Sequence, residues 1–354
     1  MVSWVDRVAP FRGRRLLRLA CVVTVLLGAA TMTAADAAFS DTESLPSATI
    51  STNQLAPPTG LTVSQTCTPP PPVVFRGATS NTGSDAIGLL VPTGVQAGDV
   101  LLAQVANRDG AYGGVSAPSG WTLLGRATSG GGVTEAVYWK IADAAEPLYY
   151  AFYLVGSSKV QMAGGMAAYG GVDQTAPVHA FGTATGAGAT ASTPSVATTV
   201  ADVVLVHTFS KRQEALPAPA GTTLRWRLMS GTGTATEGST ASDETFAGPG
   251  STPVRTTSTG FATEWVSHTV ALRPAPGIPA VTGRWTATPS TWATGYQVER
   301  MAGGVVQASG TVALSATSAS DGPLSNGLTY TFRVYAYFRS WTSPPATASL
   351  TTNC

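Results

Sequence analysis

The chain has 354 residues, enough for two or three domains, and its formal net charge of +1 gives no electrostatic reason to expect a nucleic-acid partner. Charged residues make up 11% and hydrophobic residues 44%, which excludes a disordered chain and favours one that buries a core. Abundant Gly, Ala, Thr, Ser and Val, with few helix formers, favour an all-β protein.

The N-terminus has the pattern of an export signal over residues 1–37. A basic stretch, Arg12 to Arg18, precedes a mostly apolar run, and Ala35-Asp-Ala37 fits a cleavage site. An uncleaved anchor helix is the alternative, since the run is at the short limit for a transmembrane helix. In either case we expect a polar leader over 38–54 and membrane contact only through this N-terminal segment.

Strand patterns then occur in two places that lie far apart in the chain. Residues 56–67 form a proline-led strand that ends at Cys67. The other strand patterns lie near the C-terminus, over residues 282–287, 295–300, 328–336 and 346–352. Apolar side chains alternate along these segments, which predicts strands with one buried face.

The C-terminal strands resemble a fibronectin type III domain. The resemblance rests on Trp285, on Gly295-Tyr-x-Val298 and on the strand 328–336, in which Tyr330 takes the tyrosine-corner position. It implies a seven-strand sandwich whose first strand is missing from this region, and residues 55–67 fit that strand. We therefore expect one split domain made of residues 55–67 and 278–354.

The same resemblance implies a role for two of the three cysteines. In this sandwich topology the first and last strands run in the same direction, so Cys67 and Cys354 lie at the same pole. A disulfide between them is expected in an exported chain, and free thiols or intermolecular bridges are the alternative. Closing so long a loop would cost the unfolded chain roughly 5–6 kcal/mol in the chain-entropy model.

The residues between the split halves, 73–274, predict an inserted domain with an internal repeat. Proline-rich segments enter and leave it. Ala97 to Ala103 matches Val200 to Val206, and in each half an Ala-Pro-x-Gly segment follows. The repeat predicts a duplicated β-sandwich, either two similar sheets packed face to face or two tandem small sandwiches. Asp99 and Asp202 take the same repeat position, where we expect each to bond local backbone N–H groups, and a pair of calcium ligands is the alternative.

Two shorter resemblances concern the source of the chain. Ala38-Phe-Ser-Asp-Thr-Glu43 resembles the segment after the signal in camelysin-like bacterial matrix proteins. The insert, through Gly98 to Ala103, Pro118 to Leu123 and Tyr138 to Ala142, resembles an uncharacterised module of bacterial surface and phage-tail proteins. With the Ala-, Thr- and Gly-rich composition, the first resemblance implies an exported, actinobacterial-like surface protein. The second implies that the insert is a β-sandwich without known catalytic residues.

The residues that could carry chemistry are few and scattered. The three histidines, His179, His207 and His268, show no metal-ligand or triad spacing. We expect no catalytic, cofactor or metal site and no cofactor. A glycosidase that uses Glu135 with Glu264 is a minor alternative.

Aromatic residues in the first half of the insert give the strongest indication of binding. Trp121, Trp139 and Tyr150 are the candidate glycan contacts, and core packing is the alternative reading of these rings. The sequence thus favours a non-enzymatic secreted or cell-surface protein, structural or adhesive, that displays the inserted sandwich. The alternative is a carbohydrate-binding accessory protein associated with polysaccharide degradation. The expected partners are cell-wall or extracellular glycans, or other surface proteins.

Overall fold

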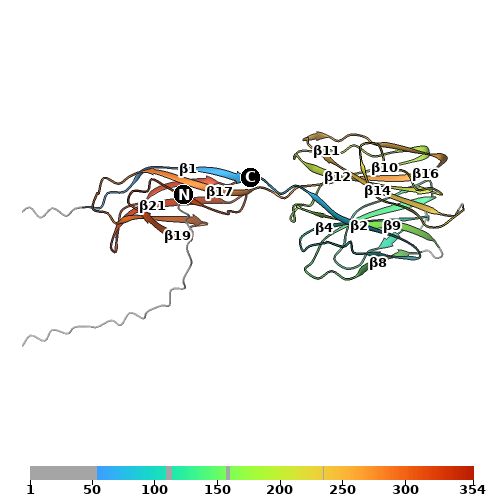
Figure 1. The fold of residues 1–354 in the computed structure, drawn as a ribbon, viewed down its shortest axis with the longest axis horizontal. Coiled ribbons are helices and arrows are strands. Elements are labelled where there is room, and N and C mark those ends of the chain that lie inside the picture. Colours follow the sequence, from blue (N-terminus) through green and yellow to red (C-terminus); the bar gives the residue numbers. More distant parts are fainter. Residues whose placement is uncertain (1–53, 109–113, 157–159, 234) are drawn as a thin grey trace, which may run out of the picture. The chain divides into compact units, whose positions relative to one another are not determined.

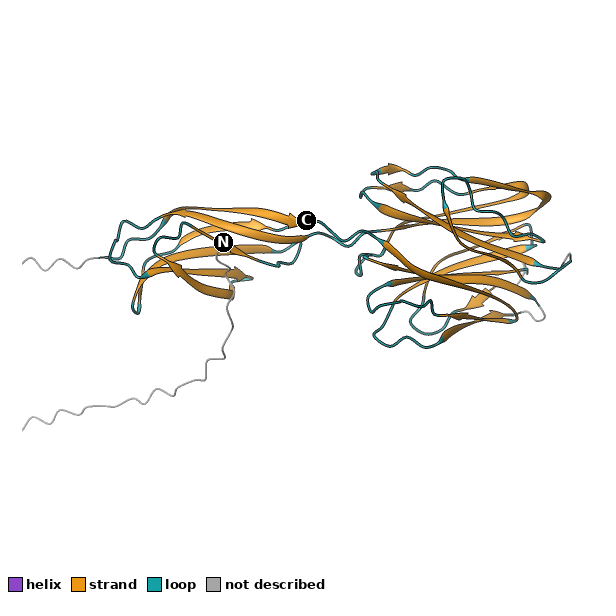
Figure 2. Cartoon of the chain, in the orientation of Figure 1, coloured by secondary structure: helices purple, strands orange, loops and turns teal. Residues whose placement is uncertain are grey.

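A computed structural model describes residues 54–108, 114–156, 160–233 and 235–354, and within these ranges every regular element is a strand (Figure 1, Figure 2). The expected all-β fold is therefore confirmed. The signal segment and nearly all of the polar leader lie outside the described residues. In the part of the chain described, no helix is long and apolar enough to cross a membrane.

Two compact units make up the described chain. One contains the residues up to Cys67 together with Pro279–Asn353, and the other contains Thr68–Ile278 together with Cys354. We call the first the split unit and the second the insert. The split unit contains the strands β1 (Thr59–Thr68), β17 (Ile278–Thr286), β18 (Gly295–Ala302), β19 (Val305–Ala313), β20 (Ser318–Asp321), β21 (Thr329–Phe338), β22 (Trp341–Thr342) and β23 (Ala346–Thr351).

The split unit is a sandwich with the strand order of a fibronectin type III-like domain. One sheet has the order β1-β17-β20, and the other has the order β19-β18-β21 with β23 also paired to β21. The core between them contains Trp285 and Tyr296, whose rings meet edge to face, together with Phe332. The hydroxyl of Tyr330 accepts a hydrogen bond from the backbone N–H of Ser325 at 3.2 Å, which confirms the tyrosine corner.

The insert takes the place of the turn between the first two strands of this sandwich. Strands β1 and β17 are neighbours in one sheet. The hydroxyl of Ser64 points to the carbonyl of Thr282, and that of Thr66 to the carbonyl of Ala280, both at 3.4 Å, so the two strands run antiparallel. The insert therefore begins and ends where two paired strands end, about 5 Å apart.

A disulfide joins Cys67 to Cys354, as the resemblance implied. Hydrogen bonds next to the disulfide also hold the two ends of the split unit together. The side chain of Gln65 donates to the carbonyl of Asn353 at 2.7 Å, and accepts from the N–H of the same residue at 3.0 Å. The disulfide thus closes a junction that the hydrogen bonds between the Gln65 side chain and the Asn353 backbone also hold together.

The two halves of the insert form sheets with the same strand order. The first half contains β2 (Val74–Ser84), β3 (Ala86–Leu90), β4 (Val100–Asn107), β5 (Gly114–Ser116), β6 (Thr122–Ser129), β7 (Val133–Ile141), β8 (Tyr149–Val155) and β9 (Gln161–Gly170). The second half contains β10 (Val178–Ser192), β11 (Ala197–Thr198), β12 (Val203–Arg212), β13 (Thr223–Met229), β14 (Glu237–Phe246), β15 (Gly250–Ser251) and β16 (Thr256–Leu272). The order β2-β9-β4-β7-β6 in the first sheet matches β10-β16-β12-β14-β13 in the second.

These two sheets pack face to face, which decides between the two arrangements that the repeat left open. Their shared core contains Val100 and Leu102 of the first sheet, and Val204, Val206 and Leu272 of the second. Each sheet also has a bulge at the same place in its edge pairing, β6 with β7 and β13 with β14. The insert is therefore one duplicated sandwich.

The first half carries an additional layer. Strands β3, β8 and β5 continue the sheet beyond β2 and fold over its outer face. Figure 1 places β8 beyond β2 and β9, on the side away from β10 and β16. Ile87, Leu89 and Phe152 of this outer layer pack on Leu101 and Met162, which face away from the second sheet.

The sequence repeat aligns the two halves one residue away from the alignment that their structures give. Aligning Asp99 with Asp202 pairs Val100 with Val203, yet Val100 faces the seam between the sheets whereas Val203 faces away from it. A shift of one residue along a strand exchanges its two faces. The two aspartates accordingly differ. Asp99 is buried, accepts from the N–H of Gln96 at 2.8 Å and lies 3.3 Å from Arg76, whereas Asp202 is exposed with φ 57°.

We expect the double variant Cys67→Ser with Cys354→Ser to fold less stably by about 2–5 kcal/mol, because its unfolded chain is no longer cross-linked. Urea unfolding of the oxidised wild type, the reduced wild type and the variant measures the difference. The reduced wild type should match the variant. Two alkylatable thiols in the folded protein, found by mass mapping without reductant, would contradict the disulfide.

Candidate functional site

The three aromatic residues proposed from the sequence as glycan contacts lie in packed positions. Trp121 packs on the core beneath the outer layer, where its ring meets Tyr150 and Phe152 edge to face at 5.2 and 5.5 Å between centroids. Tyr150 is only 9% exposed. Trp139 packs, partly buried, against the core between the two sheets of the insert. All three rings therefore make core contacts, Trp121 and Trp139 being partly buried, and the low exposure of Tyr150 leaves it little surface for stacking.

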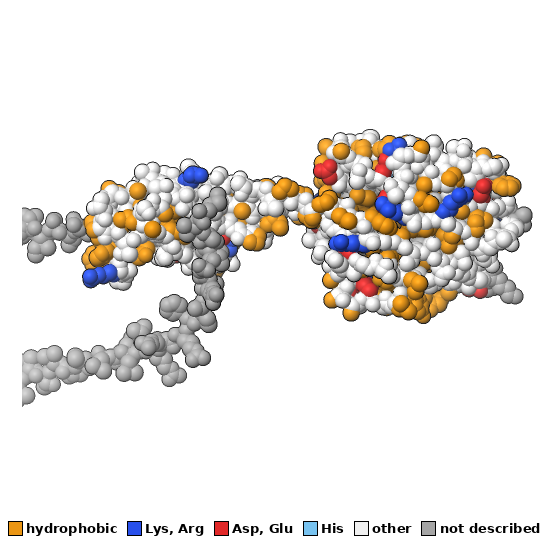
Figure 3. Space-filling view, in the orientation of Figure 1, with side chains coloured by type: hydrophobic (Ala, Val, Ile, Leu, Met, Phe, Trp, Pro, Cys, Tyr) orange, Lys and Arg blue, Asp and Glu red, His pale blue; other side chains and the backbone are white. Residues whose placement is uncertain are grey.

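In the first half of the insert, the exposed aromatic rings among the described residues are at alternate positions of β8. Tyr149 is 54% exposed and Tyr153 is 57% exposed, while Tyr150 and Phe152 between them point into the core. Leu90, which pairs with Tyr149 on the neighbouring strand, is also exposed. In Figure 3 hydrophobic side chains gather on the insert at the edge where Figure 1 places β8.

A groove of about 620 Å³ follows these two tyrosines. We call it the aromatic groove, and it is lined by Ser116, Ala117, Pro118, Pro147, Tyr149, Tyr150, Ala151 and Tyr153. Tyr149 and Tyr153 are four residues apart on one strand, so their α-carbons are about 13 Å apart. The sequence contained a signal for an aromatic strand, because four of the five residues in Tyr149-Tyr-Ala-Phe-Tyr153 are aromatic. Both faces of such a strand carry rings, so the sequence does not say which tyrosines face solvent.

A charged cluster beneath the groove fixes the position of Tyr150. The ammonium group of Lys140 contacts Asp143 at 2.6 Å and Glu146 at 2.7 Å, and the hydroxyl of Tyr150 donates to the other oxygen of Glu146. Burial raises the pKa of Tyr150 to about 12, and the hydrogen bond to Glu146 adds to the effect. Burial also acts to raise the pKa of Glu146, but the bonds from Lys140 and Tyr150 outweigh it and lower the pKa. The side chain that anchors β8 is thus held in one ionisation state near neutral pH.

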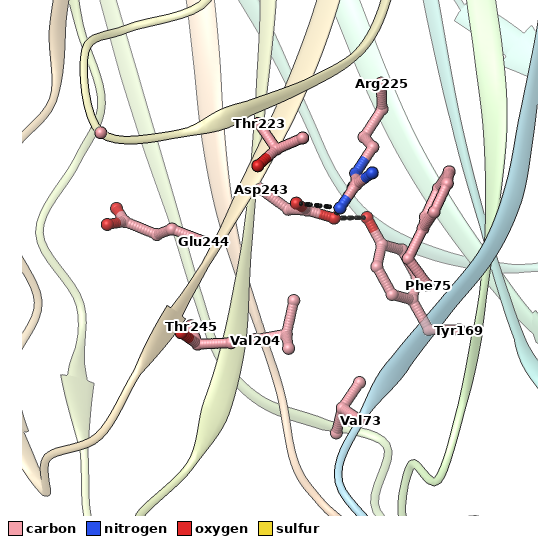
Figure 4. A pocket seen from close by; sticks show the side chains of 10 residues that line it. Val73, Phe75, Tyr169, Val204, Thr223, Arg225, Asp243, Glu244 and Thr245 are labelled. Carbon is pink, nitrogen blue, oxygen red and sulfur yellow. Dashed lines mark hydrogen bonds and ion pairs between the residues drawn. The ribbon is translucent and has the colours of Figure 1, made fainter.

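A second cavity, of about 330 Å³, lies at one end of the seam between the sheets. Figure 4 shows Arg225 and Tyr169 converging on the carboxylate of Asp243, whereas Glu244 points away from them. Arg225 donates twice to Asp243, at 2.7 Å each, and Tyr169 donates at 2.8 Å. The guanidinium group of Arg225 also lies 3.7 Å from the ring centroid of Phe75.

This arrangement ties the two sheets of the insert together. Tyr169 and Phe75 belong to the first sheet, while Arg225 and Asp243 belong to the second. Burial, and then the charge of Asp243, raise the pKa of Tyr169 well above its usual range. Every charged group named here has an opposite or hydrogen-bonding partner, so the geometry favours a structural role for the cluster.

Glu244 follows Asp243 on β14, lies on the opposite face of that strand and has its own partners. Its carboxylate accepts from Arg255, with one bond at 2.9 Å, and lies 3.1 Å from Nε2 of His207. Burial acts to raise the pKa of Glu244, but the hydrogen bonds from Arg255 and His207 outweigh it and lower the pKa to about 2. Nδ1 of His207 lies 3.1 Å from the hydroxyl of Thr269. His207 therefore serves the packing of the second sheet.

The two glutamates considered for glycoside hydrolysis do not face a common accessible site. Glu135 has no exposed surface, and one of its carboxylate oxygens accepts from Thr208 and lies 3.0 Å from Nδ1 of His268. Glu264 lies at the surface and forms an ion pair with Arg212 at 3.5 Å. A substrate cannot reach Glu135 in this structure, because two sheets cover it.

A further carboxyl group, which the sequence did not single out, lies in the same seam. Glu237 is completely buried, and neither of its oxygens has a hydrogen-bond partner among the described residues. Burial, reinforced by the negative charge of Glu135, raises the pKa of Glu237 well above its usual range. Glu237 is therefore protonated under conditions in which an exposed glutamate is ionised.

No three His, Cys, Asp or Glu side chains come close enough to hold a metal ion anywhere in the described ranges. His179, the remaining histidine, lies 2.8 Å from the guanidinium group of Arg273 through Nδ1, and its Nε2 accepts from the N–H of Thr199 at 2.9 Å.

Comparisons with known proteins do not assign this chain to a family. No protein-family model matches the chain, and no curated protein matches its sequence. Among solved structures, a segment of two fibronectin type III domains from chicken tenascin is 17% identical, covers 50% of this chain and 99% of its own, and has a TM-score of 0.19. The chicken CNTN1 FN1–FN3 domains are 12% identical, with 81% and 100% covered and a TM-score of 0.20. Domains of titin are 14% identical, with 84% and 99% covered and a TM-score of 0.19. At these TM-scores whole chains do not superpose, so the type of the split unit rests on its own strand order.

We expect Arg225→Ala to destabilise the insert by about 3 kcal/mol, because it leaves Asp243 largely buried without its cation. The double variant Arg225→Ala with Asp243→Ala should recover part of this loss. Urea unfolding of both single variants, the double variant and the wild type gives the coupling energy. A coupling energy near zero would show that Arg225 and Asp243 do not depend on each other.

We expect the stability of the wild type to fall as pH rises above about 4.5, partly through Glu237. Since the folded state raises the pKa of this carboxyl, it holds a proton that the unfolded chain loses above its usual pKa of 4.5. Glu237→Gln should therefore show a smaller fall. Part of the slope should remain, because burial also raises the pKa of Asp321. Urea unfolding across pH 4 to 8 makes the comparison, and parallel curves would contradict this role of Glu237.

Proposed function

We propose that the protein is an exported, non-enzymatic adhesion protein in which the split unit holds the insert and the insert makes the contact. The observation that carries this proposal is the aromatic groove, a pair of half-exposed tyrosines on a strand whose other face is anchored in a core. Exposed apolar surface on a well-packed sandwich is typical of a binding face. The disulfide between Cys67 and Cys354 supports export, since such bonds persist in oxidising compartments.

The proposal includes the domain organisation read from the sequence. Residues 1–37 are the signal peptide or anchor, 38–54 the polar leader, 55–67 with 278–354 the split domain, and 73–274 the insert. The source is an actinobacterial-like bacterium, and the location is the cell surface or the extracellular medium. A carbohydrate-binding accessory protein for polysaccharide degradation is the second candidate, and the two exposed tyrosines favour it.

The test is co-sedimentation of the purified full-length chain with whole cells and isolated cell walls of an actinobacterium. We expect saturable binding of the wild type. The double variant Tyr149→Ser with Tyr153→Ser should bind at least about tenfold more weakly, because each ring supplies much of the apolar contact.

The control is Phe261→Ser, which removes another exposed aromatic ring, 59% exposed, from the second sheet of the same insert. It should bind like the wild type. A wild type that stays in the supernatant, or a tyrosine double variant that sediments as well as the wild type, would overturn the proposed function of the groove.

A further inference from the structure

We infer that the ligand of the aromatic groove is a neutral polysaccharide chain, whose sugar rings stack on Tyr149 and Tyr153. This inference rests on the proposed function, because it names the partner of the same surface. It moves the sugar-binding role from Trp121, Trp139 and Tyr150, which are packed, to two tyrosines that point outward.

The spacing of the rings fits a chain and exceeds a single sugar. Tyr149 and Tyr153 lie on the same face of β8, with Ala151 between them on that face. Their α-carbons are about 13 Å apart, so one sugar ring cannot cover both side chains. Ring faces carry partial negative charge and attract the polarised C–H bonds on the flat face of a pyranose. Two such platforms in line select a polymer with a repeating flat face.

The residues between the two exposed rings have small side chains or none. Ala151 pairs with Gly88 on β3, and an added Cβ at Gly88 would lie 3.4 Å from the ring of Tyr149. One edge of the Tyr149 ring, Cδ2 and Cε2, therefore lies next to the glycine, and the side chain is 54% exposed. Ser116, which pairs with Tyr153 from the other side, supplies a hydroxyl at the rim. Flat apolar platforms with a sparse polar rim suit a ligand that offers both C–H faces and hydroxyl groups.

The charges around the groove favour a neutral polymer. None of the lining side chains is a carboxylate, an ammonium or a guanidinium group. Among the described residues, the charged cluster that contacts the lining residue Tyr150 has one lysine, Lys140, against two carboxylates, Asp143 and Glu146, which leaves one net negative charge. That charge repels acidic glycans and phosphate polymers.

The platform is rigid before any ligand arrives. Tyr150 and Phe152 alternate with the exposed tyrosines and are locked by Trp121, while Glu146 holds the hydroxyl of Tyr150. A strand anchored through every second side chain loses little conformational entropy on binding. The fixed spacing of the two exposed rings then becomes a determinant of specificity.

The test uses the disulfide-bonded full-length chain with two purified probes, a soluble neutral β-linked glucan and the acidic polymer polygalacturonate. We expect calorimetry or affinity electrophoresis to detect the glucan and to show weak or no binding of polygalacturonate. Tyr149→Ala and Tyr153→Ala should each weaken glucan binding about tenfold, which is 1.4 kcal/mol. Tyr149→Phe should bind like the wild type, because it keeps the ring face.

Two further variants separate stacking from folding. Gly88→Leu should block the groove with both tyrosines present, and Phe261→Ala should leave glucan binding unchanged. Glucan binding that is insensitive to both tyrosine variants would overturn the inference, as would preferential binding of polygalacturonate. If cell-wall binding depends on the tyrosines and yet no glucan binds, the groove recognises a wall component other than this neutral polymer. That outcome would overturn this inference and leave the proposed function standing.

Discussion

The pairing of β1 with β17 is the constraint on which the rest of the structure depends. More than half of the chain lies between these two strands, yet they are hydrogen-bonded neighbours in one sheet. The entire insert must therefore start and finish within the spacing of two paired strands. The bonds between Gln65 and Asn353 and the disulfide between Cys67 and Cys354 lie at the same end of that sheet. Loop-closure entropy grows slowly with length, which is why so large an insertion in a turn is thermodynamically tolerable.

Within the insert, the seam between the two sheets changes character along its length. At one end Val100 and Leu102 pack on Val204 and Leu272, beside the ion pair of Arg225 with Asp243. The middle is polar, since Gln104 bonds to Ser210 at 2.7 Å and accepts from Ser239 at 2.5 Å. The far end holds the buried carboxyl groups of Glu135 and Glu237. Because both halves place polar residues at matching depths, buried donors and acceptors meet across the seam, and this polar pairing selects one register of the two sheets.

The aromatic groove depends on the layer that distinguishes the first half from the second. Strands β3, β8 and β5 cover the outer face of the first sheet, and their buried side chains make the core that anchors β8. The same anchoring leaves every second residue of β8 facing outward. The proposed binding face on this layer therefore requires no groups from the seam, because the packed side chains of β8 anchor the strand while the alternate ones face outward.

The sequence by itself determined the all-β class, because alternation and turn residues are local signals. The fibronectin type III-like strands, the tyrosine corner and the disulfide were expectations of the resemblance, which the structure bears out. The sequence also revealed the repeat. Only the tertiary structure decided that the two halves meet face to face, and that Val204, not Val203, points into the seam. It also decided that Tyr149 and Tyr153 face solvent while Trp121 and Tyr150 are packed. The physical reason is that a strand has two faces related by a shift of one residue, and the sheet packed against it selects the face that is buried.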